Sequence, residues 1–437
     1  MKTSVPFHEV DMEIQYFFVN EMLKQKIISY RRDFHRHPEL GWMEQRTTDK
    51  IAGCLRELGY KVYVGFDVCD NDSRMDVPKN VNFCTGVIGV LKGTAVSKNA
   101  SKPKVTALRF DMDALPIHET LNEKNQTYCS KNDGVMHACG HDGHMAVGLG
   151  LAEILSEHKS EIGGEIRLIF QPAEEGCKGS QSIVSKGWLD NVDEFYSGHI
   201  GIGCRELGRI GVCIRGFMAS TKMNVYFHGI AAHAANAPET GRNALLAAAE
   251  FTVKAYEFYK ACPEKLRKDT RMNVGRLVSG NGRNIIADEA YLEVETRGVT
   301  SESNLYMKEK ICKTAQGTGK DHDVICEIKV VGDVVTGESD QMLAYSGYDV
   351  ACEMGIGDKF IHEAEFSASE DVVTMMNRVQ QQGGKAAYFM FGTELAAEHH
   401  HPCFDFNEDV LPLMAEFYAK LLVKKQNDCI ISGSYDV

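Results

Sequence analysis

The nine residues from 136 to 144, Met-His-Ala-Cys-Gly-His-Asp-Gly-His, constrain this chain more than any other stretch. Cys139 and His141 are two residues apart, so their side chains emerge on the same face of an extended segment. A thiolate beside an imidazole suits a borderline-soft divalent metal ion. An apolar helical run follows from Met145 to Leu155, and Asp142 is placed to cap it. The stretch predicts a metal-binding loop attached to a helix, but a free cysteine among surface histidines fits the C-x-H spacing equally well.

Composition narrows the class of protein. A chain of 437 residues is too long for one simple core, so two or three domains are expected. A formal net charge of -13 argues against nucleic acid or an anionic membrane as the main partner. No apolar run reaches the roughly 20 residues of a membrane span. The 14 cysteines have no framework spacing and the first ten residues lack a signal-peptide layout, so we expect a soluble cytoplasmic enzyme.

Polar side chains recur just beyond apolar strands. Predicted strands at 105–110, 165–170, 194–197 and 386–391 are each followed by residues able to bind metal or move protons. Open α/β sheets place their ligands at the carboxyl ends of strands, and repetition of the pattern is stronger than any single instance. The residues concerned are Asp111, Asp113, Glu174, Glu175, His199 and the run His399, His400 and His401.

Residues 217–333 read as an inserted unit. Between Lys222 and Val331 the strand and helix patterns run β-α-β-β-α-β, the order of a ferredoxin-like domain. The α/β pattern resumes afterwards with a helix from Asp340 to Glu353 and the strand at 386–391. We therefore predict an α/β protein with a catalytic domain (1–216 and 334–437) whose mixed sheet is flanked by helices. The inserted ferredoxin-like α+β domain (217–333) is expected to serve as lid and dimerisation domain.

The candidate ligands are one thiolate, one carboxylate and three imidazoles: Cys139, His141, Glu175, His199 and His400. A single metal ion needs four ligands, or three plus water. Five ligands, one of them a sulfur that can bridge, suit two divalent ions about 3.5–4 Å apart. Glu174 is then free to act as general base on water and later as proton donor to the leaving group. The set predicts metal-assisted hydrolysis of an acyl bond, and neither H-E-x-x-H nor G-x-S-x-G occurs in the chain.

The motifs resemble those of the amidohydrolase branch of the dinuclear metallopeptidase/aminoacylase superfamily, which includes the hippurate hydrolases. The matching stretches, in chain order, are 31–40, 111–116, 137–144, 169–176, 198–200 and 231–234. Within this branch, stretches 73–75, 217–222, 280–285 and 391–397 are most similar to the A subunits of p-aminobenzoyl-glutamate hydrolases. The resemblance implies that Cys139 bridges the metals and that Asp113 lies close to them without ligating. The C-terminal ligand aligns best with His400, with His399 and His401 left as alternatives.

The resemblance also implies a substrate and partners. It indicates an N-acyl or N-aroyl amino acid, p-aminobenzoyl-glutamate first among them, and two manganese or zinc ions. His233 and Asn284 match substrate contacts of the lid, His233 can stabilise an oxyanion, and Arg283 can hold the substrate's carboxylate. Pairing of exposed lid edges predicts a homodimer. The alternatives are another hippurate-like substrate, or a non-catalytic metal-binding subunit that works with a homologous second chain.

Overall fold

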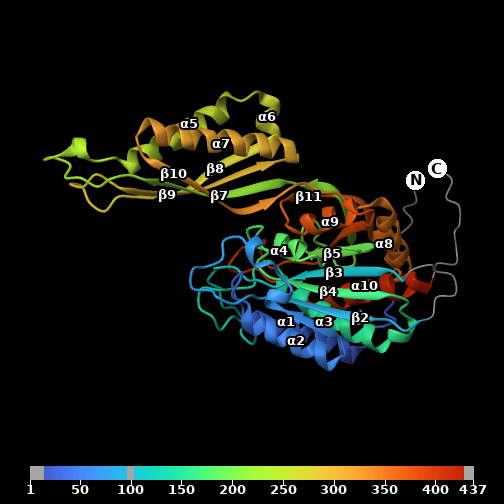
Figure 1. The fold of residues 1–437 in the computed structure, drawn as a ribbon. Helices are drawn as coiled ribbons and strands as arrows, with labels where there is room; N and C mark the ends of the chain where they lie inside the picture. The colour runs from blue at the N-terminus through green and yellow to red at the C-terminus, as the bar shows by residue number, and fades with distance from the viewer. Residues whose placement is uncertain (1–13, 96–102, 428–437) are drawn as a thin grey trace, which may run out of the picture.

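The strands of the computed structural model, which describes residues 14–95 and 103–427, form two separate sheets (Figure 1). The large sheet has eight strands in the order β1-β2-β4-β3-β5-β12-β6-β11. Their bounds are β1 Lys61–Val64, β2 Val87–Lys92, β3 Val105–Asp111, β4 Glu165–Gln171, β5 Glu194–Ile200, β6 Ile210–Phe217, β11 Phe360–Ala368 and β12 Lys385–Phe391. Strands β4, β3, β5 and β12 run parallel, whereas β1, β2 and β6 each have antiparallel neighbours. The predicted mixed sheet is confirmed.

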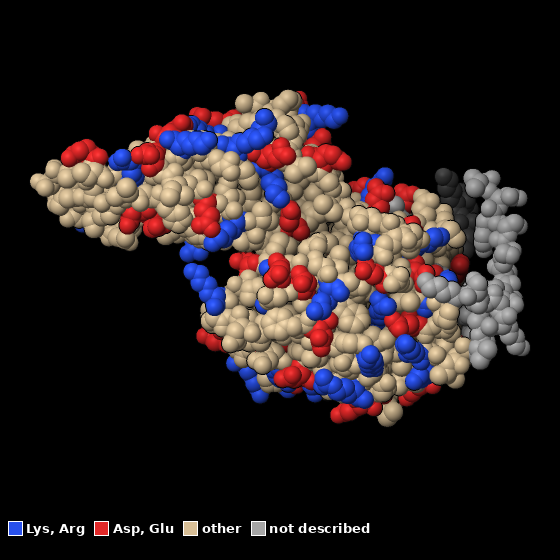
Figure 2. Space-filling view, in the orientation of Figure 1, with Lys and Arg blue, Asp and Glu red and all other residues tan. Residues whose placement is uncertain are grey.

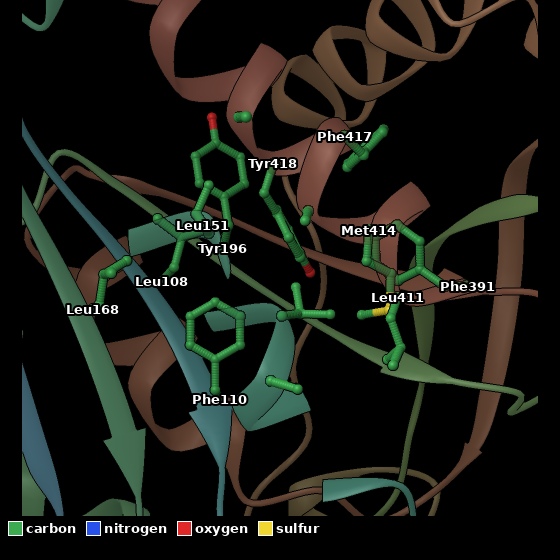
Figure 3. Packing of buried hydrophobic residues seen from close by; sticks show 14 of the residues in the cluster. Leu108, Phe110, Leu151, Leu168, Tyr196, Phe391, Leu411, Met414, Phe417 and Tyr418 are labelled. Atoms are coloured by element: carbon green, nitrogen blue, oxygen red, sulfur yellow. The ribbon is translucent and has the colours of Figure 1, made fainter. Parts of the chain in front are cut away.

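Helices cover both faces of the large sheet. One face packs against α1 (Glu21–Arg36), α2 (Gln45–Glu57), α3 (His141–Glu157), α8 (Gln341–Glu353) and α10 (Val410–Asn427). The other packs against the short α4 (Ser180–Ser185) and α9 (Val372–Gln381). The first core joins strand residues such as Leu108 and Phe110 to Leu151 of α3 and to Phe417 and Tyr418 of α10 (Figure 3).

Helix α3 lies in the middle of this core, and nearly all of its residues are buried. A helix that is apolar all round needs neighbours on every side. Small residues allow that close approach, because a Cβ at Gly148 would lie 2.7 Å from the Phe170 ring and one at Gly150 would lie 2.5 Å from Ile27. The first turn of α3 is thereby fixed at the carboxyl end of the sheet, directly after Cys139.

The second sheet has the order β10-β7-β9-β8 and is antiparallel throughout. It consists of β7 (Ala219–His228), β8 (Thr270–Ser279), β9 (Glu289–Gly298) and β10 (Ile325–Val334), with α5 (Ala244–Ala261), α6 (Glu264–Asp269) and α7 (Ser301–Asp321). We call residues 219–334 the small unit and the remainder the large unit. Side chains of β7, β9, α5 and α7 form a core of their own, including Phe227, Phe251, Leu292 and Met307.

Within the described part of the chain, no helix covers the other face of the small sheet. Its helices lie on the side away from the large unit (Figure 1). Along β7 and β9 the buried residues alternate with half-exposed polar ones, as expected when one face is packed and the other is wet. In Figure 2 the small unit projects beyond the large unit as an arm, and the space beneath the arm is open.

Several predicted elements need correction. The apolar spacing of residues 11–36 predicts an amphipathic helix over that range. Helix α1 begins only at Glu21, because Asn20 caps it by accepting a hydrogen bond from the Leu23 N–H at 2.9 Å. Residues 11–13 lie outside the described residues. Strands β6 and β11 and helix α9 were not predicted. No helix within 14–95 and 103–427 is both long and apolar enough to cross a membrane.

Candidate metal centre

The predicted ligands meet at the carboxyl ends of the parallel strands of the large sheet. Cys139 stands two residues before α3, and His141 is the first residue of that helix. Glu174 and Glu175 follow the end of β4, and His199 is the next-to-last residue of β5. His400 comes from the loop between β12 and α10, whose backbone is tied down where the His400 N–H donates to the Ala138 carbonyl at 2.8 Å.

Two groups of potential ligands share the thiol of Cys139. One contains His141 and His199, the other Glu175 and His400, and within each group the ligand atoms lie within 4.8 Å of one another. The Cys139 Sγ lies 3.5 Å from His199 Nε2, and His400 Nε2 lies 3.2 Å from Glu175 Oε1. A sulfur that belongs to both groups agrees with the prediction that Cys139 bridges two ions.

The protonation preferences and free atoms of the site fit a divalent cation. The Nε2 atom of His141 is buried and makes no hydrogen bond with a described residue, which costs about 1–3 kcal/mol unless another partner binds it. Its other ring nitrogen lies 2.8 Å from the Asp113 carbonyl oxygen, which fixes the ring. Burial and the charges of Glu175 and Glu174 raise the pKa of Cys139 well above its usual value, so a thiolate here needs a cation.

His199, which is grouped with Cys139 and His141, has the protonation state that binds metal. Burial and the nearby histidines His144 and His399 lower the pKa of His199 well below its usual value. The ring is therefore neutral, and a neutral imidazole has a lone pair to offer. His141 differs: burial lowers its pKa, but Asp111 and Asp113 outweigh burial and raise it from 6.5 to about 10, so a metal ion bound there has to displace a proton. The donor types of the predicted set suit two ions of zinc or manganese character.

The turn that carries the two glutamates is held through three consecutive backbone N–H groups. The N–H groups of Glu174 and Glu175 donate to the two carboxylate oxygens of Asp113, each at 2.9 Å. The Ala173 N–H donates to Oε1 of Glu44, also at 2.9 Å. Ala173 has a positive φ of 51°, a strained conformation that persists only when its surroundings fix it. Asp113 lies next to the ligands with both oxygens occupied, which agrees with a supporting role.

Of the three consecutive histidines, only His400 is grouped with Cys139 and Glu175 among the described residues. His399 is not in this group: its Nε2 lies 3.0 Å from the Ile200 carbonyl, and its ring lies 4.8 Å from the Phe404 ring and 5.3 Å from the His199 ring. The Nδ1 atom of His401 accepts a hydrogen bond from the Cys403 N–H. His400 has a positive φ of 63°, so the backbone is bent sharply at the residue nearest the site.

The predicted substrate contacts are not close to these ligands. His233, Arg283 and Asn284 are exposed on two loops of the small unit. The two loops are joined to each other, because His233 pairs with Ile285 in an isolated bridge and the Ala234 N–H donates to the Asn284 carbonyl at 3.1 Å. The loops follow β7 and precede β9, at the end of the arm farthest from the large sheet (Figure 1).

Asp142 does not cap α3, contrary to the sequence prediction. Gly140 occupies the N-cap position with a φ of 91°, so the helix begins two residues earlier than an Asp142 cap requires. Asp142 Oδ2 instead accepts from Arg31 Nε at 2.8 Å and lies 2.8 Å from His35 Nδ1. Arg31, fully buried, also donates to Asp405 at 2.7 Å. It thereby connects the start of α3 to the segment that follows His400.

A second buried network behind the ligands was not recognised in the sequence. Arg109 of β3 donates to Asp111 at 2.7 Å and to Glu370 and Asp371 at 3.0 and 3.1 Å. Asp111 in turn lies 2.6 Å from Nδ1 of His144. Burial and the charges of Glu370 and Glu175 raise the pKa of Glu174 well above its usual value. A lone arginine within the apolar strand 105–110 was the available signal, because a buried charge needs partners.

Comparison with known proteins identifies a family. Residues 107–424 match the sequence profile of Peptidase family M20/M25/M40. The A subunit of the p-aminobenzoyl-glutamate hydrolase of Escherichia coli (strain K12) is 38% identical over 431 residues, which cover 94% of this chain and 98% of that protein. The indole-3-acetyl-aspartic acid hydrolase of Enterobacter agglomerans is 37% identical over 426 residues, which cover 92% and 97%.

Two solved structures share the fold. The aminobenzoyl-glutamate utilization protein from Klebsiella pneumoniae is 31% identical with a TM-score of 0.73, over 92% of this chain and 97% of that one. A dinuclear metal-binding peptidase of the M20 family from Bacillus subtilis is 26% identical with a TM-score of 0.66, over 93% and 99%. The fold and the thiol-sharing ligand groups define a hydrolase of amide bonds that depends on two metal ions. The chain belongs to peptidase family M20/M25/M40.

Proposed function

We propose that this chain hydrolyses N-acyl or N-aroyl derivatives of acidic amino acids, with p-aminobenzoyl-glutamate as its substrate. The observation that carries the proposal is the pair of ligand groups sharing Cys139, with the buried carboxyl of Glu174 beside them. The two relatives named above act, by their names, on an aspartate and a glutamate conjugate. Both conjugates join an aromatic acyl group to an acidic amino acid through one amide bond.

The ligands proposed are Cys139, His141, Glu175, His199 and His400. Two divalent ions held there would polarise the scissile carbonyl and make a water molecule nucleophilic near neutral pH. Glu174 takes the proton of the attacking water and gives it to the departing amide nitrogen. Its Oε2 atom lies 3.9 Å from His141 Nε2, so the carboxyl stands beside the ligand set.

The small unit is proposed to act as a lid. His233 would stabilise the oxyanion of the tetrahedral intermediate, while Arg283 and Asn284 would bind the substrate's carboxylate. All three are on the joined loops at the tip of the arm, so the lid has to close for them to reach the reacting atoms. The connections before β7 and after β10 are the hinges in this proposal.

The remaining features of the proposal concern the metal, the assembly and the compartment. Manganese or zinc is proposed, since thiolate favours zinc while the resemblance favours manganese. The exposed edge strand β8 supports a homodimer through the lids. A cytoplasmic location is supported by the twelve cysteines described in the structure, all of which are free thiols.

The test is a substrate panel on the purified chain after loading with manganese or zinc. We expect release of p-aminobenzoate from p-aminobenzoyl-glutamate, compared with hippurate and indole-3-acetyl-aspartate. Glu174→Gln is the matched control: it should lose about 10²- to 10⁴-fold in kcat because it removes the proton carrier. Its metal content by elemental analysis should stay the same, since Glu174 is outside the proposed ligand set.

Each outcome distinguishes one alternative. Cleavage of hippurate alone would shift the substrate to the hippurate class. Activity that appears only after addition of a homologous second chain would favour the hetero-complex. Absence of hydrolysis of all three compounds by metal-loaded protein would overturn the proposed function, and metal loss in Glu174→Gln would show that Glu174 is a ligand.

A further inference from the structure

Lys222 lies where the small unit contacts the turn that carries Glu174 and Glu175. In the small sheet Lys222 of β7 is paired with Gly332 of β10 on one side and with Glu295 of β9 on the other. Residues directly opposite each other in antiparallel strands direct their side chains to the same face of the sheet. The direction of a Cβ at Gly332 therefore shows which way Lys222 points.

A side chain on this face points toward the turn that carries Glu174 and Glu175. A Cβ placed on Gly332 would lie 2.1 Å from the carbonyl oxygen of Gly176, the residue after Glu175. The Asp333 N–H also donates to the Cys177 carbonyl at 3.3 Å. The open face of the small sheet thus touches the turn at Gly332, and Lys222 lies on the neighbouring strand of the same face.

No described carboxylate forms an ion pair with Lys222. Its cross-strand neighbour Glu295 is engaged elsewhere, 3.0 Å from Arg297 Nη2 and accepting from Ser220 Oγ at 3.2 Å. Asp333 is bound by Thr221 and Lys308.

We infer that Lys222 binds the side-chain carboxylate of the acidic amino acid in the substrate and so selects acidic over neutral leaving groups. This inference rests on the proposed function, and it assigns a second anion-binding position, separate from Arg283 and Asn284 at the lid tip. A half-buried ammonium group without an ion pair is a strong partner for a carboxylate, because charge-assisted hydrogen bonds strengthen as water is excluded. Since Lys222 sits at the base of the lid, it can contact the substrate before the tip closes.

The experiment compares p-aminobenzoyl-glutamate with p-aminobenzoyl-glutamine, which has the same size and an uncharged side chain. In Lys222→Met, kcat/KM for the glutamate compound should fall about 10- to 100-fold, the loss expected for one charge-assisted hydrogen bond. The value for the glutamine compound should stay nearly unchanged, so the preference for glutamate disappears. Lys222→Arg should keep much of the preference.

A matched control is Lys329→Met on β10 of the same sheet. Lys329 already pairs with Glu327 at 3.0 Å, so its removal should alter neither compound. Metal content and the midpoint of thermal unfolding are measured for every variant, and Lys222→Gln replaces Lys222→Met if the latter does not fold. An equal loss for both compounds, or an unchanged preference in Lys222→Met, would overturn the inference.

Binding measurements separate this inference from the proposed function. Isothermal titration of both compounds is carried out on Glu174→Gln, with and without Lys222→Met. If wild-type protein hydrolyses neither compound, the proposed function fails. Glutamate-selective binding lost with Lys222→Met would then still support the carboxylate position, and binding without selectivity would overturn it.

Discussion

Glu44 supports the turn that carries Glu174 and Glu175, although it is not one of the proposed ligands. It is fully buried, accepts from Thr85 Oγ1 at 2.6 Å and from the Ala173 N–H at 2.9 Å. Burial and the negative charge of Asp113 raise its pKa from 4.5 to about 8, despite these hydrogen bonds. At neutral pH the folded protein therefore holds a proton on Glu44 that the unfolded chain has released.

This difference predicts how stability depends on pH. Because the folded state binds the extra proton between the unfolded and folded pKa values, the contribution of Glu44 to stability falls as pH rises from about 4.5 to 8. Glu44→Gln does not titrate, so its midpoint of thermal unfolding should improve relative to wild type over that interval. Glu57→Gln, at an exposed position on α2, is the control. The difference between its midpoint of thermal unfolding and that of wild type should not change with pH. Parallel curves for Glu44→Gln and wild type from pH 5 to 9 would contradict the prediction.

At the residue scale, the sequence predicted those site residues that belong to short local motifs. Glu175 and His400 come after the predicted strands at 165–170 and 386–391. The predicted loop at 136–144 brings Cys139 and His141 to the same place. Their roles as ligands stay a prediction. The support of the turn by Glu44 was not predicted, because Glu44 and Ala173 are 129 residues apart and only the tertiary fold brings them together. Arg109 and Glu370 are 261 residues apart and were missed for the same reason.

At the scale of elements, the buried central strands of the large sheet were predicted well, whereas its edge strand β11 was missed. Strands β3 and β4 were predicted at 105–110 and 165–170, and each extends one residue further. Strand β11 was missed because it is an edge strand whose exposed positions include Glu363 and Glu365, so its pattern resembles a polar loop. Burial on both faces produces the apolar runs that sequence patterns detect.

The contact between β10 and the turn after Glu175 can be tested with one methyl group. Gly332→Ala would put a Cβ against the Gly176 carbonyl, and backbone on both sides leaves little room to adjust. We expect a loss of about 1–3 kcal/mol in the free energy of unfolding, typical of overpacking, and weaker metal binding by titration. Gly317→Ala in α7 is the control, since no atom lies within 4 Å of its added Cβ. It should be neutral or stabilising by up to about 1 kcal/mol. Unchanged stability and metal affinity in Gly332→Ala would show that β10 does not constrain the turn.

At the scale of the whole molecule, family membership and the mixed α/β fold are confirmed, whereas the assembly remains a prediction. Sequence patterns determine which side chains a chain buries within itself. They carry much less information on surfaces that two chains bury together, since non-obligate interfaces are about as apolar as the rest of the surface. The position of the arm relative to the large unit was likewise not predictable, because it involves contacts between distant parts of the chain, such as that of Gly332 with the Gly176 carbonyl.

Exposed apolar side chains on the small unit support the predicted dimer. Leu245, Leu246 and Val253 of α5 are 42%, 50% and 56% exposed, and Leu277 and Val278 of the edge strand β8 are 41% and 50% exposed. Helix α5 packs against β8, so these residues border one edge of the small unit. An apolar helix beside an unpaired strand is the arrangement that a two-fold pairing of lids would bury.

The dimer is tested by sedimentation of wild-type protein and Leu246→Asp. We expect wild type at twice the mass of one chain, and a shift toward monomer in Leu246→Asp, because a carboxylate at the centre of an apolar interface loses its hydration. Leu121→Asp is the control: Leu121 is 66% exposed on the large unit, so this variant should remain dimeric. If the lids also need each other to hold the tip loops in place, Leu246→Asp will lose kcat while keeping its metal content. A wild-type chain that sediments as a monomer at micromolar concentration would rule out the lid-paired dimer.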